Sequence, residues 1–462
     1  MTDLLPPAMF AGLVLAILSG FPVAFALAAV ASAFGAIGVA AGRFEPAFLE
    51  IMILRVNGVF ANDNLLAVPM LILIGMLLER TGLAEDMFTA LNRLFGRQPG
   101  GLAYTTVLVG AVLSAVTGFV AASVVALGLI ALPVMLRQGY DHRLSAGVVA
   151  ASATLAQVIP PSLVLIVLAE QMEVSLQDIY RGALLPSAIL VGAYLGYVGI
   201  VARRAPARVP PATPVGGDQP RLRLWLEAAV AAGIPLGIVV TVLGAVFLGV
   251  AAPTEGGAIG VTGTLLFALG RRRLTLSGLR AAMEVTGTLT AGLVFLLLGA
   301  SFFILVFRGL DGGEWVEGLL SGLPAGALGY VLFVNLLVFV LAFFVEFFEI
   351  AFIVLPLVAP VARALGVDMV WLTVLLAVNL QTSFMHPPFG LAVLNLRTVA
   401  PRAVRTLDLY RGALPFLGVQ LFVLVLLVAA PGIVLKRTPA APVPGASFES
   451  QLPPPPPLIE EL

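Results

Sequence analysis

Two apolar stretches of this chain each end in polar side chains followed by two consecutive prolines. The first, residues 151–157 (ASATLAQ), precedes Pro160 and Pro161, and the second, residues 379–386 (NLQTSFMH), precedes Pro387 and Pro388. Proline cannot donate a backbone hydrogen bond and displaces the residue before it from helical geometry. The unwound carbonyls, hydroxyls and amides at such a break can coordinate a hard cation, and half-helix N-termini can attract a carboxylate. These residue types therefore predict ion coordination and anion binding.

The two proline pairs belong to an internal repeat with a spacing of 227 residues. Four more features recur, the last with a spacing of 230: Pro133 as Pro360, Gly139 as Gly366, Asp141 as Asp368, and 180–184 (YRGAL) as 410–414. We expect both aspartates to cap helices beside glycine turns. Matched interrupted segments in two halves of a membrane protein indicate a transporter with its binding site at the repeat interface.

Composition places the chain in a membrane. Hydrophobic residues make up 60% of it and charged residues 11%. Apolar runs such as 182–202, 284–307 and 411–435 each approach the roughly 20 residues that cross a hydrocarbon core. We therefore expect an all-α polytopic protein with about eleven or twelve membrane segments. The absence of cysteine and the presence of two histidines argue against disulfides, thiolate sites and a multi-histidine metal centre.

Each half also contains an apolar segment with a distinctive middle. The segment at about 101–136 has small and hydroxyl residues there, namely Ser114, Thr117, Gly118 and Ser123. The aligned segment at about 331–362 has two carboxylates instead, Glu346 and Glu349. Both patterns predict re-entrant hairpins, and the broken helices are expected at about 143–169 and 367–396. Carboxylates in an apolar stretch cost about 2.5–3.5 kcal/mol each on insertion, so a lipid-facing position is disfavoured.

Basic loops predict the orientation and the domain boundaries. Residues 203–223 contain five arginines and are expected to form a cytoplasmic linker between a first repeat at 1–202 and a second at 224–437. The Arg-rich segments 271–273 and 397–411 are expected on the same side, whereas 170–181 and 308–317 are acidic, which predicts inverted repeats. The Pro-rich tail at 438–462 is expected to be disordered.

The motifs resemble a known family. The hairpin at 114–123, the segment 139–141 (GYD), the run 159–162 (IPPS) and above all 379–390 (NLQTSFMHPPFG) are similar to the large membrane (M) subunit of tripartite ATP-independent periplasmic (TRAP) transporters, over about residues 7–435. The resemblance implies a multi-pass protein of the bacterial inner membrane and a sodium-coupled elevator carrier of organic acids. The expected substrate is a C4-dicarboxylate or a 2-oxo or 2-hydroxy monocarboxylate. The implied partners are a small four-helix membrane subunit and a periplasmic substrate-binding protein, and no cofactor is expected besides Na⁺.

The same resemblance implies two sodium sites with the substrate between them. The site in the first half would contain Ser114, Thr117, Gly118, Ser123, Ser152, Thr154, Pro160 and Pro161. The site in the second half would contain Glu346, Glu349, Gln381, Thr382, Ser383, His386, Pro387 and Pro388. Two departures from the family pattern stand out: the first tip reads VTGF at 116–119, and His386 occupies a position where many relatives have threonine.

Other interpretations remain open at this point. Paired prolines can be simple kinks, and small hydroxyl residues can let helices pack closely. An intramembrane enzyme is disfavoured because the sequence lacks a cysteine nucleophile, a His-Glu-x-x-His pair and a serine–histidine constellation. A passive channel would neither saturate nor need an ion gradient. A standalone ion-coupled carboxylate carrier that needs no binding protein is the nearest alternative.

Overall fold

The computed structural model describes residues 4–212, 220–322, 324–388 and 390–435. Within these ranges the chain is helical, without β-strands. The helices of the first half are α1 (Leu5–Leu18), α2 (Val23–Ala40), η2 (Pro46–Glu50), α3 (Ile51–Phe60), α4 (Asp63–Arg80), α5 (Leu83–Phe95), α6 (Gly101–Thr117), α7 (Val120–Arg137), α8 (His142–Thr154), η3 (Leu155–Gln157), α9 (Leu163–Gln171) and α10 (Leu176–Arg204).

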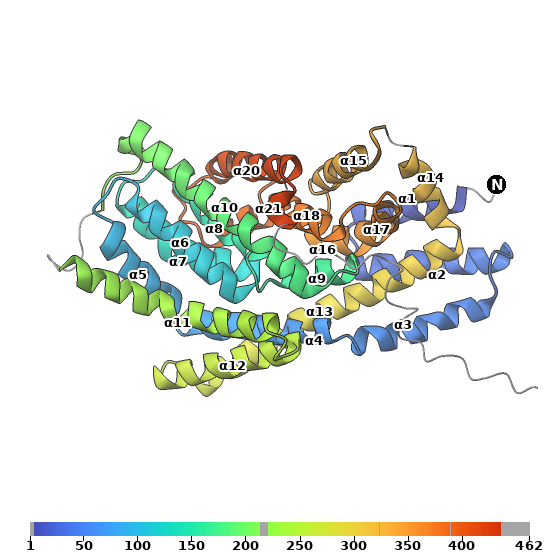
Figure 1. The fold of residues 1–462 in the computed structure, drawn as a ribbon, viewed down its shortest axis with the longest axis horizontal. Helices are drawn as coiled ribbons and strands as arrows, with labels where there is room; N and C mark the ends of the chain where they lie inside the picture. The colour runs from blue at the N-terminus through green and yellow to red at the C-terminus, as the bar shows by residue number, and fades with distance from the viewer. Residues whose placement is uncertain (1–3, 213–219, 323, 389, 436–462) are drawn as a thin grey trace, which may run out of the picture.

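A short helix, η4 (Pro206–Arg208), leads towards the second half. The helices there are α11 (Arg221–Phe247), α12 (Pro253–Gly270), α13 (Leu276–Gly309), α14 (Gly312–Ser321), α15 (Gly326–Leu341), α16 (Phe347–Glu349), the π-helical turn η5 (Ile350–Val354), α17 (Leu355–Ala364), α18 (Met369–Ser383), α19 (Leu391–Val399), α20 (Thr406–Ala429) and α21 (Gly432–Leu435). Elements from both halves meet in the middle of the molecule, while α11 and α12 run along its lower edge (Figure 1).

Seven helices of the described residues are long and apolar enough to cross a membrane, or eight if the bent pair Pro46–Phe60 and Asp63–Arg80 counts as one span. The sequence predicted eleven or twelve segments. The difference arises because several apolar segments are divided into shorter helices: α1, α6, α15 and α18 are apolar helices of 10–17 residues. A helix of that length falls short of the roughly 20 residues needed to span alone.

The halves interlock through α8 and α20. A Cβ added to Gly147 of α8 would lie 2.0 Å from the Gly412 carbonyl oxygen, and one added to Gly412 would lie 1.9 Å from the Arg143 carbonyl oxygen. The two helix backbones therefore touch directly, as small residues allow in membrane helices. Beside this contact, the Arg143 guanidinium donates to the Asp408 carboxylate (3.1 Å). The first broken helix is thus packed against the last long helix of the chain.

The repeat seen in the sequence has a structural counterpart. Gly139 and Gly366 both adopt positive φ angles, +80° and +69°. The carboxylates that follow cap α8 and α18 as expected: Asp141 accepts from the Leu144 N–H (2.9 Å) and Asp368 from the Trp371 N–H (2.8 Å). Pro133 and Pro360 lie inside α7 and α17.

The described part of the linker is packed against the first half. The Gly100 N–H donates to the Val209 carbonyl (3.0 Å), and the Arg208 guanidinium forms an ion pair with Asp141 (3.0 Å). Partial burial opposes ionisation of Asp141, but hydrogen bonds from the Leu144 N–H and from Arg208 outweigh it and hold the pKa of this carboxyl below its usual value. Helix α11 begins at Arg221, inside the range expected for the linker. The predicted disordered tail at 438–462 lies outside the described residues.

The two capping aspartates provide a matched stability test. We expect Asp141→Ala to lower the melting temperature more than Asp368→Ala, because Asp141 also holds Arg208. Loss of an N-cap costs about 1 kcal/mol. Since the folded pKa of Asp141 lies below its unfolded value, its contribution is present above the unfolded pKa and is lost as pH falls through the folded pKa. Thermal unfolding in detergent at neutral and acidic pH measures both effects, and equal shifts for the two variants would contradict the role of Arg208.

Candidate functional site

Both proline pairs lie where a helix is broken. Helix α8 ends at Thr154, continues as the single turn η3, and gives way to α9 only at Leu163. Helix α18 ends at Ser383, and α19 begins at Leu391. The Pro160–Pro161 and Pro387–Pro388 bonds are both cis. The two predicted broken helices are therefore present.

Side chains satisfy some of the backbone groups that the breaks leave free. Ser162 Oγ donates to the Gln157 carbonyl (2.8 Å) and accepts from the Val164 N–H (3.2 Å). Ser187 Oγ donates to the Val158 carbonyl (2.8 Å). In the second break, the Tyr410 hydroxyl donates to the Pro388 carbonyl (2.6 Å). Hydroxyl groups on neighbouring helices thus hold both unwound segments in place.

The tip between α6 and α7 brings the residues predicted there together. Gly118 ends α6 with a positive φ of +57°. The hydroxyls of Thr117 and Ser123 lie 2.7 Å apart, and Ser114 Oγ lies 3.2 Å from the carbonyl oxygen of Ser152 on α8. The tip and the neighbouring α8 therefore provide two pairs of buried oxygen atoms, Thr117 with Ser123 and Ser114 with Ser152.

The tip between α15 and α16 carries the two carboxylates, which lie in different environments. Glu349 is 9% exposed, and among the described residues its Oε2 has no hydrogen-bond partner. Glu346 is exposed, and its side chain does not cap α16, although it occupies the N-cap position. Glu349 is followed directly by the π-helical turn η5, a distortion that is frequent at functional sites.

The residues predicted at the second break make separate contacts. Thr382 and Ser383 donate to carbonyls of their own helix, those of Asn379 and Leu380, at 2.6 Å. The imidazole of His386 is fully buried against two aromatic rings, one in α15 and one just after its end. It is edge-on to Phe339 of α15 with centroids 4.6 Å apart, and it is stacked on Phe343 at 4.2 Å.

Thr154 and Gln381 meet at the centre of the molecule. The sequence assigned them to two different sites, yet they are equivalent in the repeat, and Gln381 Nε2 donates to Thr154 Oγ1 (3.1 Å). The Tyr194 hydroxyl accepts from Gln420 Nε2 (2.8 Å) and from Gln381 Nε2 (3.4 Å). All four side chains are fully buried. This polar cluster joins α8, α10, α18 and α20 where the halves meet.

Buried polar atoms without partners concentrate around the breaks. Among the described residues they include Ser152 Oγ, Gln157 Oε1, Asn379 Oδ1, Gln381 Oε1 and Gln420 Oε1. Such groups are costly unless an ion, water or ligand satisfies them. The five atoms named here are oxygens, which suit a hard cation. Gln157 Nε2 and both imidazole nitrogens of His386 also lack partners among the described residues. Within the described ranges no three His, Asp or Glu side chains are grouped so as to hold a metal ion.

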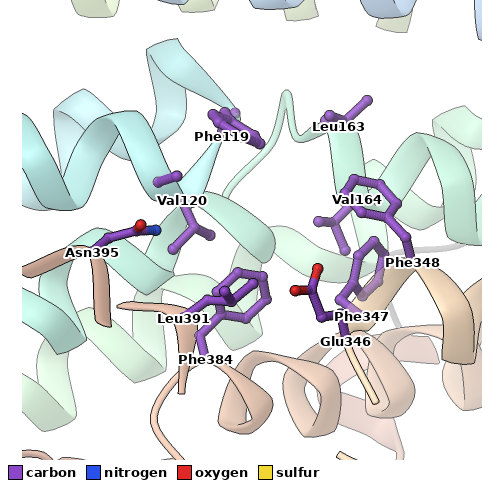
Figure 2. Close-up of a pocket in the computed structure, with 12 residues that line it drawn as sticks. Phe119, Val120, Leu163, Val164, Glu346, Phe347, Phe348, Phe384, Leu391 and Asn395 are labelled. Atoms are coloured by element: carbon purple, nitrogen blue, oxygen red, sulfur yellow. The ribbon is translucent and has the colours of Figure 1, made fainter. Parts of the chain in front are cut away.

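A cavity of about 120 Å³ separates the two tips (Figure 2). It lies between repeat-equivalent positions, because Phe119 corresponds to Glu346 and Val164 to Leu391. Among the described residues no lysine or arginine lines it. Its walls are Gly118, Phe119, Val120, Ala121, Leu163, Val164, Glu346, Phe347, Phe348, Phe384, Leu391 and Asn395.

Four helices begin at this cavity. Val120, Leu163, Phe347 and Leu391 line it, and they are the first residues of α7, α9, α16 and α19. Helix α16 is continuous with η5 and α17 as an 18-residue span. Each helix N-terminus contributes partial positive charge. Some first-turn N–H groups already have partners, since Val164 N–H donates to Ser162 Oγ and Ala392 N–H to the Phe384 carbonyl. An anion near these helix ends would therefore gain from favourable backbone charge without any basic side chain, on the side of the cavity away from Glu346.

Sequence reasoning missed several residues of this region. Tyr194 and Gln420 complete the central cluster. The Asn335 carbonyl accepts a hydrogen bond from the side-chain amide of Asn379 (2.7 Å), and Asn395 lines the cavity. Polar side chains inside apolar helices are costly in lipid and mark functional positions. That signal could have identified Gln420 and Asn335, whereas the phenylalanines of the cavity resemble ordinary core residues.

Comparison with known proteins agrees with this architecture. Residues 10–433 match the model of the family described as "Tripartite ATP-independent periplasmic transporter, DctM component". The C4-dicarboxylate TRAP transporter large permease protein DctM of Pseudomonas aeruginosa is 28% identical over 393 residues, 85% of this chain and 90% of that protein. The ectoine/5-hydroxyectoine TRAP transporter large permease protein UehC of Ruegeria pomeroyi is 27% identical over 429 residues, 92% and 97% of the two chains.

Among solved structures, the Alcanivorax borkumensis YdaH transporter is similar in fold. Its TM-score is 0.58 at 17% identity, with 86% of this chain and 91% of that chain covered. Together with the apolar helices, the family match places the protein in the inner membrane as a multi-pass transport component, not an enzyme. The chain belongs to the DctM family, the large permease component of tripartite ATP-independent periplasmic transporters.

Proposed function

We propose that this chain performs sodium-coupled secondary active uptake of an organic acid by an elevator mechanism. The convergence of four helix N-termini on a cavity between the two tips supports this proposal most directly. A carboxylate there would accept hydrogen bonds from backbone N–H groups and gain from the helix dipoles. Because this binding depends on the two halves together, the acid would be held where they meet.

Sodium would bind on both sides of the acid. In the first half, the oxygens of Ser114, Thr117, Ser123 and Ser152 are grouped at the tip beside the break. In the second half, Glu349 and the carbonyls before Pro387 offer oxygen ligands, and the side-chain oxygen of Asn379 lacks a partner. Cations at these positions would lower the cost of bringing an acid into a membrane-embedded cavity.

The elevator step would move the tips and broken helices past the outer helices. Hairpin α6–α7 and hairpin α15–α17 would be re-entrant, in inverted halves. At Gly75 of α4, a Cβ would lie 2.8 Å from Cα of Thr117. The first tip therefore rests on α4 by backbone contact, without a large side chain to obstruct sliding. A contact without interlocking side chains would allow the first tip to slide along α4.

The partners follow from the family. Its description as a tripartite periplasmic transporter supports a small four-helix membrane subunit and a periplasmic binding protein that delivers the acid. The relatives' names include C4-dicarboxylate and ectoine transport, so the family model alone does not select the acid. The alternative, a standalone ion-coupled carboxylate carrier, would need no binding protein.

Uptake into proteoliposomes tests the proposal. We expect accumulation of labelled acid only when the chain, its small subunit, the binding protein and an inward sodium gradient are all present. Uptake that saturates with sodium but needs no binding protein would support the standalone carrier. Accumulation that persists without any ion gradient would contradict secondary active transport.

A further inference from the structure

One side of the cavity between the tips is acidic and aromatic, which indicates the chemical class of the substrate. Resting on the function proposed above, we propose that the acid carried by this chain is a small zwitterion. Its carboxylate would bind at the helix N-termini, and its alkylated, cationic nitrogen would be held by Glu346 and the surrounding phenylalanines. Betaines have this chemistry.

The Glu346 side chain lines the cavity. Figure 2 shows it pointing into the cavity. Among the described residues no hydrogen bond or ion pair reaches its oxygens, and it does not cap its own helix. The Glu346 side chain is exposed, but its neighbours in the cavity wall are mainly apolar, so pairing with a cation would stabilise the carboxylate. A cationic group of the ligand would supply that pairing.

Four phenylalanines line the same cavity: Phe119, Phe347, Phe348 and Phe384. Phe347 and Phe348 form an edge-to-face pair with centroids 4.9 Å apart. Aromatic faces attract cations, and groups of them recognise quaternary ammonium ligands. Phenyl rings are poor hydrogen-bond acceptors, so Glu346 alone would leave part of the three N–H donors of a primary ammonium unpaired here. A methylated nitrogen has no such requirement, which favours an alkylated cation.

The rest of the cavity suits a single carboxylate. Helices α7, α9 and α19 begin there, and the side-chain amide of Asn395 can donate a hydrogen bond. No lysine or arginine is present among the described lining residues to neutralise a second carboxylate, which would instead face Glu346. A dicarboxylate is therefore disfavoured by like-charge repulsion.

The volume also limits the ligand. At about 120 Å³, the cavity is smaller than the roughly 300–1,000 Å³ of drug-sized sites and holds the equivalent of about four water molecules. A compound the size of glycine betaine is appropriate, whereas a sugar acid would be too large.

The chain has no cysteine, so a single introduced thiol can report on the cavity. In Ala121→Cys, on the lining, we would measure protection from a small thiol reagent by glycine betaine, by 3,3-dimethylbutanoate, its isostere with carbon in place of the cationic nitrogen, and by succinate. We expect half-protection by glycine betaine at a concentration about tenfold lower than by the isostere, and no protection by succinate over the same range. Adding Glu346→Gln should remove this preference, whereas the matched control Glu314→Gln, an exposed carboxylate on α14, should keep it.

The outcomes separate this inference from the proposed function. Protection by succinate equal to that by glycine betaine, or a preference that survives Glu346→Gln, would overturn the zwitterion assignment and leave the carrier function intact. A loss of sodium stimulation for every acid in Glu346→Gln, with the betaine preference retained, would make Glu346 a sodium ligand and also overturn it. Betaine-selective protection without sodium-driven uptake by the complete transporter would support the inference and overturn the proposed function.

Discussion

Gly412→Ala should strongly destabilise the folded protein. The new Cβ would lie 1.9 Å from the Arg143 carbonyl oxygen and 3.1 Å from the Gly147 nitrogen. These are backbone atoms of α8, so no side chain can rotate away and the helices must separate. Overpacking costs about 1–3 kcal/mol or more, a large part of the roughly 5–15 kcal/mol that stabilises most proteins. Fluorescence-detected size exclusion should show little monodisperse material and a lowered melting temperature.

Gly418→Ala is the matched control on the same helix. A Cβ at Gly418 meets nothing within 4 Å, and alanine favours helix by about 1 kcal/mol over glycine. This variant should elute like the wild type with an equal or higher melting temperature. Equal behaviour of the two variants would show that α8 and α20 are not in backbone contact.

The second large effect is expected at the first tip, where Thr117→Val with Ser123→Ala should eliminate most sodium-driven uptake. The two hydroxyls are buried and lie 2.7 Å apart. A neutral group bonded to a charge contributes about 1.5–3 kcal/mol, so loss of two ligands should raise the sodium concentration for half-maximal uptake at least about a hundredfold. Uptake measured against sodium concentration tests this directly.

Thr106→Val serves as the control for that experiment. Thr106 is also buried on α6, but its hydroxyl donates to the Leu102 carbonyl of its own helix (2.8 Å). We expect a normal sodium dependence in this variant. If the variant with both Thr117→Val and Ser123→Ala also shows the normal sodium dependence of uptake, Thr117 and Ser123 are not sodium ligands.

Much of this architecture could be predicted from proline, glycine and aspartate. Paired prolines cannot continue a helix, a glycine at positive φ ends one, and an aspartate starts the next. These rules are local, so both breaks, both turns and both caps follow from the sequence.

Long-range contacts could not be predicted in the same way. The YRGAL segments look alike, yet a Cβ at Gly412 would lie nearest to backbone atoms of α8. The three atoms nearest to a Cβ at Gly182 belong instead to side chains, those of Val434, Val370 and Val374. Likewise, the sequence predicts that Thr154 and Gln381 belong to separate sites, one in each half of the repeat. Their contact depends on how the halves pack, which neither local propensity nor the repeat spacing specifies.

The contact between α8 and α20 also constrains biogenesis. About 250 residues separate the two helices along the chain, so α8 leaves the ribosome long before its partner exists. At roughly 5–20 residues per second, that interval lasts about ten to fifty seconds. During that interval, the face of α8 that contains Gly147 must be covered by lipid, by a chaperone or by another segment. The final packing of the first half therefore waits for nearly complete synthesis, and a ribosome stalled before α20 would leave a product for quality-control proteases.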